Sequence, residues 1–489
     1  MLSMIVCLLS AGLALGARLD VWAGTLGTST FTTGQGGASS VEFQNSGLGV
    51  TTTGGKDFLV LSSFTTANTD AEKDRNRAGR WQIATDYTGG NYTYSTAMSS
   101  VSGSAIYERW MQGKQVVGSS DYGSVNMNGI YNFGSSGSHS FDLYHRTNGG
   151  SDVVTRNGSM LVVSLNVAGT TLRHGTAQQD SSITANGPTP YMSTTTSDSW
   201  SKVKQSSGGS DLAATIDVSE YGGEVFVAAS MNCNKLGSGG DAVKGDWQLV
   251  LYDSGGTEVE RLGTSIQRVV VDANKDDGAA MLYATTSDLD AGTYTVKLEQ
   301  KVDAASATAG LGVETFNASI NAVALTLQDG DEAGQRFESF SVGNTDTEDN
   351  ATGTPQRAVE DNFITIPEDQ GLILASHYTT SGDGVQTGDS SISLYNLGDT
   401  ESVYDSVNTL RSVGSNGPSG AGGVIGYADS LTAGDYEAAL NFLSDANTFS
   451  LTDANLVGFA TVSVPEPSMV SLLALFATAC MFNRRRFSR

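Results

Sequence analysis

Short apolar runs flanked by turn residues recur along the chain, and three of them are alike. The run DFLVLSSF covers 57–64, EVFVAASM covers 224–231 and GLILASHY covers 371–378. A run of this length, bounded by turn residues and with few polar positions, is typical of a strand that is buried on both faces. We therefore expect the same kind of buried strand at three places in the chain.

The patterns around these runs also repeat in the same order. Each run is preceded by a short segment that ends at Phe43, Val218 or Ile366. Four further predicted strands follow each run in the same order. They are a second strand, a short strand after a polar turn, a strand that contains Phe141, Tyr294 or Tyr436, and a closing apolar strand. Self-similarity at this scale indicates repeated domains. The sequence predicts an all-β protein built of three tandem β-sandwiches, either immunoglobulin-like or jelly-roll-like.

Polar segments rich in Gly and Pro, such as ANGPTP, SSGGS and NTDTEDNATGTP, suggest where the repeats end. The predicted organisation has eight parts, namely a signal peptide (1–16), an N-terminal segment (17–39), repeat 1 (40–168), a linker (169–209), repeat 2 (210–328), a linker (329–354), repeat 3 (355–463) and a C-terminal tail (464–489).

Aromatic residues at equivalent places of the repeats predict two further features, a buried tryptophan and a tyrosine corner. Trp81 and Trp247 align between the first two repeats, and we interpret them as core residues. If both were exposed, they would instead favour a carbohydrate-binding platform. Tyr294 and Tyr436 each follow a tight turn, where a tyrosine hydroxyl can bond back to the main chain, and Phe141 takes the same place without a hydroxyl.

Charge and cysteine usage narrow the function classes. The formal net charge of -25 repels phosphate backbones, so we do not expect the protein to bind nucleic acid. Two of the three cysteines, Cys7 and Cys480, lie in terminal apolar segments, which leaves Cys233 alone among the repeats. A single thiol forms no intramolecular disulfide, and we interpret Cys233 as a small buried apolar residue.

The N-terminus, MLSMIVCLLSAGLALGARLD, has the features of a secretory signal peptide. An apolar stretch ends in small residues, Ala14 and Gly16, at the positions that signal peptidase requires for cleavage before Ala17. We therefore expect export by the Sec translocation machinery.

The C-terminus, VPEPSMVSLLALFATACMFNRRRFSR, has three parts. Val464, Pro465, Glu466 and Pro467 form an extended, helix-excluding peptide. An apolar stretch follows, and then come three basic residues (Arg484, Arg485, Arg486). The order predicts a short transmembrane helix in the inner membrane with its positive end kept in the cytoplasm.

This tail resembles the PEP-CTERM sorting domain of bacteria with a Gram-negative-type envelope. In that family an exosortase, a membrane-embedded processing enzyme, recognises the tail, and the carriers are exported proteins often associated with exopolysaccharide and biofilm. The resemblance implies that Pro465, Glu466 and Pro467 are the recognition peptide. It covers the tail alone and implies nothing about what the repeats bind.

Motifs for catalysis and cofactors are few. The chain has no HExxH, GxSxG, P-loop or CxxC pattern. Asp272, Asn274 and Asp276 match the first half of a calcium loop, but Asp277 replaces the turn glycine and Tyr283 replaces the bidentate glutamate. We interpret this segment as a solvated acidic turn and expect no cofactor, with Ca²⁺ as the one candidate ion.

Together these features predict an exported, non-enzymatic structural or adhesive protein of the cell envelope or extracellular matrix. It would be anchored transiently in the membrane before processing and could contact extracellular polysaccharide. One alternative is an array of carbohydrate-binding modules, which needs exposed aromatic or acidic sites. Another is a secreted glycan-active enzyme, which needs two carboxylates that converge in a cleft. The sequence itself names no ligand-binding residue.

Overall fold

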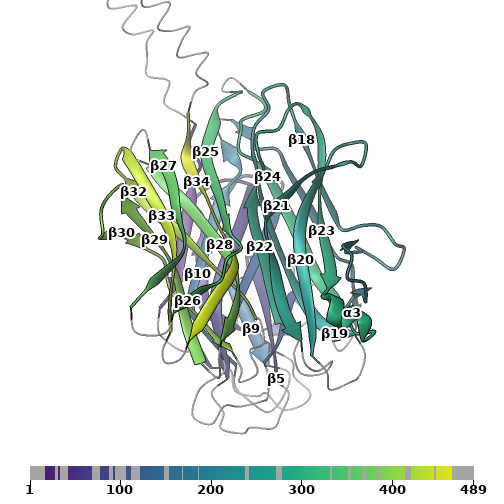
Figure 1. Ribbon diagram of the computed structural model, residues 1–489. Helices are drawn as coiled ribbons and strands as arrows, with labels where there is room; N and C mark the ends of the chain where they lie inside the picture. The colour runs from purple at the N-terminus through teal and green to yellow at the C-terminus, as the bar shows by residue number, and fades with distance from the viewer. Residues whose placement is uncertain are drawn as a thin grey trace, which may run out of the picture.

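Antiparallel strands make up nearly all the regular structure of the chain (Figure 1). The computed structural model describes residues 17–27, 31–32, 42–68, 77–87, 92–93, 106–111, 122–147, 153–167, 169–184, 187–236, 242–270, 278–330, 333–350, 354–366, 370–382, 386–413, 420–444 and 448–464. Within these ranges the one helix is the single turn α3 (Ala304–Thr308). The predicted all-β class is confirmed.

The strands form three sandwiches, each made of an inner and an outer sheet. In the first sandwich the inner sheet has the order β1 (Val21–Leu26), β10 (Val153–Ser164), β4 (Asp57–Asn68), β8 (Tyr122–Asn132), and the outer sheet has the order β3 (Glu42–Thr51), β9 (Ser140–Thr147), β5 (Arg77–Thr85), β7 (Ile106–Met111). In the second, the inner order is β13 (His174–Gln178), β24 (Gly312–Ala324), β19 (Val225–Leu236), β22 (Gly278–Thr285), and the outer order is β18 (Ala213–Val218), β23 (Gly292–Val302), β20 (Val243–Tyr252), β21 (Glu258–Val270).

The third sandwich repeats this arrangement. Its inner order is β25 (Arg336–Asn344), β34 (Phe449–Val464), β28 (Gln370–Gly382), β32 (Gly420–Leu431), and its outer order is β27 (Gln356–Ile366), β33 (Gly434–Ser444), β29 (Gln386–Asn396), β30 (Ser402–Asp405). Short strands extend the sheets, namely β2 (Phe31–Thr32), β6 (Tyr92–Thr93), β16 (Ser193–Thr195), β17 (Ser201–Lys202), β26 (Glu348–Asn350) and β31 (Thr409–Val413). Two small hairpins pair β11 (Asn166–Val167) with β12 (Thr170–Thr171) and β14 (Ser181–Thr184) with β15 (Gly187–Pro190).

The three similar apolar runs form β4, β19 and β28 in the inner sheets, and both faces of these strands are buried. In β4, Phe58 and Val60 point into the core of the first sandwich, whereas Leu59 and Leu61 belong to a cluster shared between sandwiches. That shared cluster also contains Ile373 from β28. Alternate residues of a strand face opposite sides of its sheet, so a strand that is buried twice has to be apolar almost throughout.

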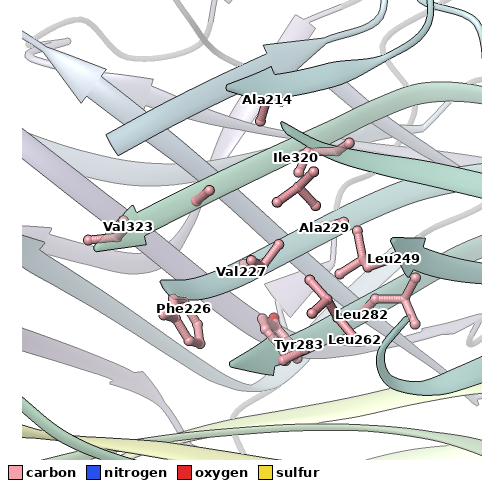
Figure 2. Packing of buried hydrophobic residues seen from close by; sticks show 14 of the residues in the cluster. Ala214, Phe226, Val227, Ala229, Leu249, Leu262, Leu282, Tyr283, Ile320 and Val323 are labelled. Atoms are coloured by element: carbon pink, nitrogen blue, oxygen red, sulfur yellow. The ribbon is translucent and has the colours of Figure 1, made fainter. Parts of the chain in front are cut away.

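The inner sheets pack against one another in a closed ring. Strand β8 of the first sandwich contacts β19 and β24 of the second, β22 of the second contacts β28 and β34 of the third, and β32 of the third contacts β4 and β10 of the first. Figure 1 shows the second sandwich in teal beside the third in green and yellow, with purple strands of the first behind them. Figure 2 shows part of the shared cluster, including Phe226, whose ring centroid lies 5.0 Å from that of Phe459.

Polar side chains bridge each of the three junctions. Asn321 donates to Asn128 between the second and first sandwiches (2.6 Å). The Tyr283 amide donates to His377 Nδ1 between the second and third (3.0 Å). The Ile425 amide donates to Ser63 Oγ between the third and first (3.3 Å). Buried hydrogen bonds of this kind fix the register of one sheet on the next.

Three segments that the sequence predicts to lie outside the repeats contain inner-sheet strands. The N-terminal segment (17–39) holds β1, the segment at 169–209 holds β13 and β16, and the segment at 329–354 holds β25 and β26. The segment at 169–209 also holds β17 of the outer sheet. All three segments thus contribute strands to the sandwiches. The strands are short or lie at a sheet edge, where one face stays polar, so their sequences resemble those of loops.

The predicted tyrosine corners are confirmed in the second and third sandwiches. Tyr294 donates its hydroxyl to the carbonyl of Asp290 (3.1 Å), and Tyr436 donates to the carbonyl of Thr432 (2.7 Å). Phe141 is fully buried in the first sandwich, where it keeps the packing alone.

The start of the described chain closes the ring onto the third sandwich. Leu19 donates its amide to the Thr461 carbonyl, and Ser463 donates its amide to the Ala17 carbonyl (both 2.8 Å). The buried Gln335 Oε1 accepts from the Ala17 amide (3.0 Å) and from Ser463 Oγ (2.7 Å). Residues 17–20 therefore lie along β34, although β1 belongs to the first sandwich.

We expect Gln335→Ala to lower the free energy of unfolding by about 1–2 kcal/mol, because two buried donors lose their acceptor. Gln356→Ala is the matched control, since Gln356 is exposed on β27. Denaturant titration followed by circular dichroism measures both. Equal effects of the two substitutions would show that the contact with Ala17 adds nothing to stability.

Candidate functional site

A cleft of about 440 Å³ lies where the second and third sandwiches meet. Its walls come from β21, from the residues that follow β22, and from β25 and β34. The lining is polar and contains two carboxylates and five hydroxyl side chains, namely Glu224, Glu260, Thr264, Thr285, Thr286, Ser287 and Ser341.

The two carboxylates are held by hydrogen bonds. Glu260, on β21, accepts from the amide (3.0 Å) and the hydroxyl (2.9 Å) of Ser287. Glu224 immediately precedes β19 and accepts from Ser339 Oγ of β25, a bond that crosses the junction. Burial raises the pKa of Glu224 above its usual range, and the hydrogen bond from Ser339 opposes that shift.

Asn455, on β34, lies at the floor of the cleft and is 1% exposed. Its Nδ2 donates to the Tyr283 carbonyl of the neighbouring sandwich (2.7 Å). Its Oδ1 is buried and has no partner among the described residues. Two glycines make room for this amide, since a Cβ at Gly263 would lie 2.8 Å from Nδ2 and one at Gly343 would lie 3.2 Å from Oδ1.

Phe340 of β25 is the aromatic residue of the cleft lining in the described part of the chain. Its side chain is half-buried and packs over Gly458, where a Cβ would approach the ring to 2.5 Å. A smaller pocket of about 150 Å³ adjoins the cleft at Glu224. In that pocket Arg336 is already engaged by Asp288 (2.7 Å) and the Tyr221 carbonyl (3.1 Å).

Chemically, the cleft offers hydrogen-bond acceptors and hydroxyls, and no Lys or Arg is among its described lining residues. Within the described ranges no three His, Cys, Asp or Glu side chains come together in a way that could hold a metal ion. The two carboxylates meet part of the requirement for a glycan-active enzyme, because both line one cleft.

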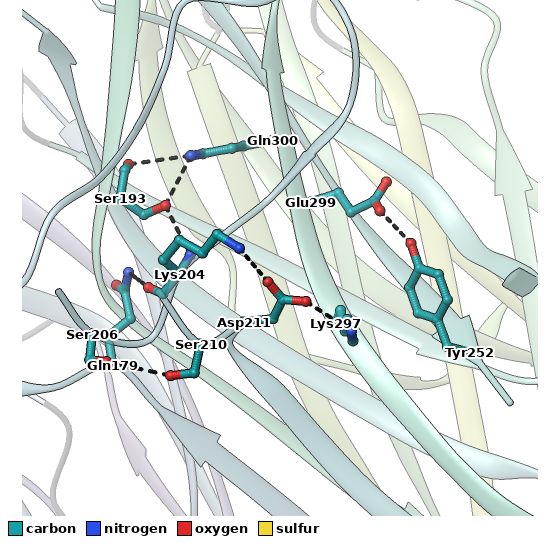
Figure 3. Close-up of polar contacts among 10 residues, drawn as sticks. All are labelled: Gln179, Ser193, Lys204, Ser206, Ser210, Asp211, Tyr252, Lys297, Glu299 and Gln300. Carbon is teal, nitrogen blue, oxygen red and sulfur yellow. Dashed lines mark hydrogen bonds and ion pairs between the residues drawn. The ribbon is translucent and has the colours of Figure 1, made fainter. Parts of the chain in front are cut away.

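A second polar cluster lies on the outer sheet of the second sandwich (Figure 3). Tyr252 donates to Glu299 (2.5 Å), and Asp211 accepts from Lys204 (2.6 Å) and Lys297 (2.9 Å). Burial is the main cause that raises the pKa of the Tyr252 hydroxyl. These groups satisfy one another, so the cluster stabilises the sheet.

Trp200 lies at the edge of the same sheet. Lys301 Nζ lies 4.5 Å and the Arg261 guanidinium carbon 5.5 Å from its ring centroid. Because these two cations already pack over the half-buried ring, its face is not free to stack on a ligand.

Trp81 and Trp247 are fully buried, which confirms their interpretation as core residues. Trp81 Nε1 donates to Thr155 Oγ1 (2.9 Å) and Trp247 Nε1 to Thr315 Oγ1 (2.7 Å). The same threonines contact His145 in the first sandwich and Gln300 in the second. A carbohydrate platform built on these two tryptophans is therefore excluded.

Most residues of the predicted sorting and metal sites lie outside the described part of the chain. These are Ala14, Gly16, Pro465, Glu466, Pro467, Arg484, Arg485 and Arg486 of the two termini, and Asp272, Asn274 and Asp276 of the calcium candidate. Ala17 is buried, and Val464 is the last residue of β34. In the part of the chain that the structure describes, no helix is long and apolar enough to cross a membrane.

The residues of the cleft were not predicted from the sequence. Glu224 opens one of the three similar runs, but no local pattern indicates that it shares a cleft with Glu260 and Asn455. Their proximity depends on how one sandwich docks on the next.

No protein-family model and no curated protein matches the chain. Among solved structures, the recombinant peptide N-glycanase F is 10% identical over 63% of this chain and 96% of that one, with a TM-score of 0.28. The tandem CBM22 domains of Paenibacillus barcinonensis Xyn10C are 11% identical over 57% of this chain and 96% of that one (TM-score 0.17). Murine APRIL is 15% identical over 26% and 100% (TM-score 0.18). Similarities this low support no shared function.

Proposed function

We propose that the chain is an exported protein of three tandem β-sandwiches, immunoglobulin-like or jelly-roll-like, that acts, without catalysis, as a structural or adhesive component of the cell envelope or extracellular matrix. The Sec machinery would export it, the C-terminal helix would hold it transiently in the inner membrane, and an exosortase-type enzyme would process the tail. Extracellular polysaccharide is the proposed partner.

The observation that carries the proposal is the three-part tail, in which VPEP, an apolar stretch and three arginines follow one another. The position of both ends of the folded part supports it. Ala17, the first residue after the expected signal cleavage, is hydrogen-bonded to Ser463, next to the last residue of β34. The two ends of the folded part, next to which both processing steps are proposed, therefore lie together.

The shape of the protein also supports a mechanical role. The three sandwiches share one apolar cluster and are bridged by hydrogen bonds at every junction. A body held together in this way resists separation of its domains better than sandwiches joined by flexible linkers.

Replacement of Pro465, Glu466 and Pro467 by alanine tests the proposal. In the native bacterium we expect the wild-type chain to lose its tail and reach the surface or medium, and the variant to stay in the inner-membrane fraction at full mass. Immunoblots of cell fractions, with intact-mass measurement, distinguish the two.

The control combines Pro355→Ala with Glu401→Ala, which removes a proline and a carboxylate from exposed positions of the third sandwich. The control should be processed like the wild type. Unchanged processing and display of the tail variant would refute the sorting proposal.

A further inference from the structure

We propose that the cleft between the second and third sandwiches binds a neutral saccharide. The inference deepens the adhesive role proposed above and rests on it. In this inference Glu260, Asn455 and Phe340 contact the polysaccharide, and the tryptophans of the sandwich cores do not.

The first argument is the floor of the cleft. A buried carbonyl oxygen without a hydrogen bond is costly, and in native proteins such a group usually has a protein, water or ligand partner. Asn455 Oδ1 has none among the described residues, and it lies against Gly343, which also lines the cleft. Because this oxygen has almost no accessible surface, a ligand hydroxyl supplies the missing donor once the lining at Gly343 shifts to admit it.

The second argument is the chemistry of the walls. Glu224 and Glu260 accept hydrogen bonds, and the threonine and serine hydroxyls around them can donate or accept. A ligand with many hydroxyl groups matches this lining. An anionic ligand does not, because two carboxylates face it and the nearby Arg336 is bonded to Asp288.

The third argument is the half-buried ring of Phe340. Ligand sites commonly combine a few polar groups with an aromatic surface. The positively polarised C–H groups of a sugar ring fit the negative face of an aromatic ring. Phe340 thus adds an apolar contact to the hydrogen bonds of the walls.

The fourth argument is that the described residues at the equivalent places of the other two junctions differ. Asn455 is opposite His377 across β34 and β28, whereas the equivalent pairs are two serines each, Ser159 with Ser63 and Ser319 with Ser230. Glu224 corresponds to Asp57 in the first run, and the Asp57 carboxylate is already bonded by Asn132 and Asn166. In the third run the corresponding residue is Gly371. The polar cleft is therefore not a general requirement of the ring.

Affinity electrophoresis of the purified full-length protein tests the inference. The native gels contain dextran, β-1,3-glucan or galactomannan as neutral probes and alginate as an acidic one. We expect retardation by at least one neutral probe and none by alginate.

Three variants weaken the interaction in different ways. Asn455→Ser introduces the residue found at the equivalent places and should weaken binding roughly tenfold through loss of one acceptor. Glu260→Gln keeps the bond from Ser287 but removes the charge, for about a fivefold loss. Phe340→Ala should cost roughly tenfold through loss of the aromatic surface.

Matched controls lie on the same strand or in the same sandwich. Glu258→Gln alters an exposed carboxylate two residues from Glu260, and Phe363→Ala removes an exposed ring of the third sandwich. Both should bind like the wild type. Circular dichroism identifies any variant that fails to fold, and the inference is then tested with the variants that do fold.

The inference is overturned if no neutral probe retards the protein, if alginate alone does, or if cleft and control variants lose binding equally. Release of reducing ends from a probe would also overturn it, because the cleft would then be an active site. If the protein binds a neutral probe through the cleft but its tail is not processed, the proposed sorting is refuted and the proposed saccharide site is not.

Discussion

Trp247→Ala is expected to lower the free energy of unfolding by about 3–5 kcal/mol. The Trp247 side chain is fully buried in the second sandwich, and its indole packs so closely over Gly245 that a Cβ there would lie 2.5 Å from the ring. The substitution leaves a large cavity and removes the donor to Thr315 Oγ1. Denaturant titration followed by circular dichroism measures the loss.

Trp200→Ala is the matched control in the same sandwich. Its half-buried ring contacts Lys301 and Arg261 at the surface, so its removal should cost about 1 kcal/mol or less. Equal losses for the two tryptophans would contradict the assignment of Trp247 to the core.

Acidification from pH 7 to pH 5 is expected to destabilise the protein through two buried histidines. His377 Nδ1 accepts the Tyr283 amide, and its Nε2 lies 3.2 Å from the Thr264 carbonyl oxygen, an arrangement that suits the neutral ring. Burial lowers the pKa of His377 to about 4 and that of His145 to about 3. Both values lie below the usual value of 6.5.

The sign of the effect follows from proton linkage. Above pH 6.5 both histidines are neutral in the folded and unfolded chain, so their contribution to stability is fully present. Below pH 6.5 the unfolded chain takes up the protons first, and stability is lost until the folded pKa is reached. By pH 5 the loss is about 2 kcal/mol for each histidine, or about 4 kcal/mol together.

Substitutions taken from the other repeats isolate this effect. His377→Ser introduces the serine that the other two repeats have at this place. His145→Gln introduces the glutamine of the second repeat, because Gln300 lies opposite Trp247 as His145 lies opposite Trp81. Each should remove about 2 kcal/mol of the loss between pH 7 and pH 5. Asp246 works in the opposite direction, because burial raises its pKa to about 6, so the comparison is between variant and wild type at each pH. An unchanged pH dependence in both variants would refute the role of the histidines.

The alternation of side chains explains which strands the sequence predicts well. The runs that form β4, β19 and β28 are apolar on both faces, and their prediction as buried strands is confirmed. The corner tyrosines are equally local features, because the hydroxyl bonds to a carbonyl four residues earlier.

The strands β8, β22 and β32 were not predicted, and their composition gives the reason. Strand β32 begins GAGGVIG, and a Cβ at Gly423 would lie 2.6 Å from the Ser376 carbonyl oxygen and 3.0 Å from Met281. Small residues are needed because neighbouring backbones approach closely, yet glycine lowers the strand signal of a sequence. The cleft was missed because its residues meet only after the sandwiches dock.

Differential scanning calorimetry of the protein tests most directly the central claim that three repeats of one pattern form a single body. The shared apolar cluster and the bonds at all three junctions predict one cooperative transition, with equal calorimetric and van't Hoff enthalpies. Separate transitions for the individual sandwiches would contradict the claim.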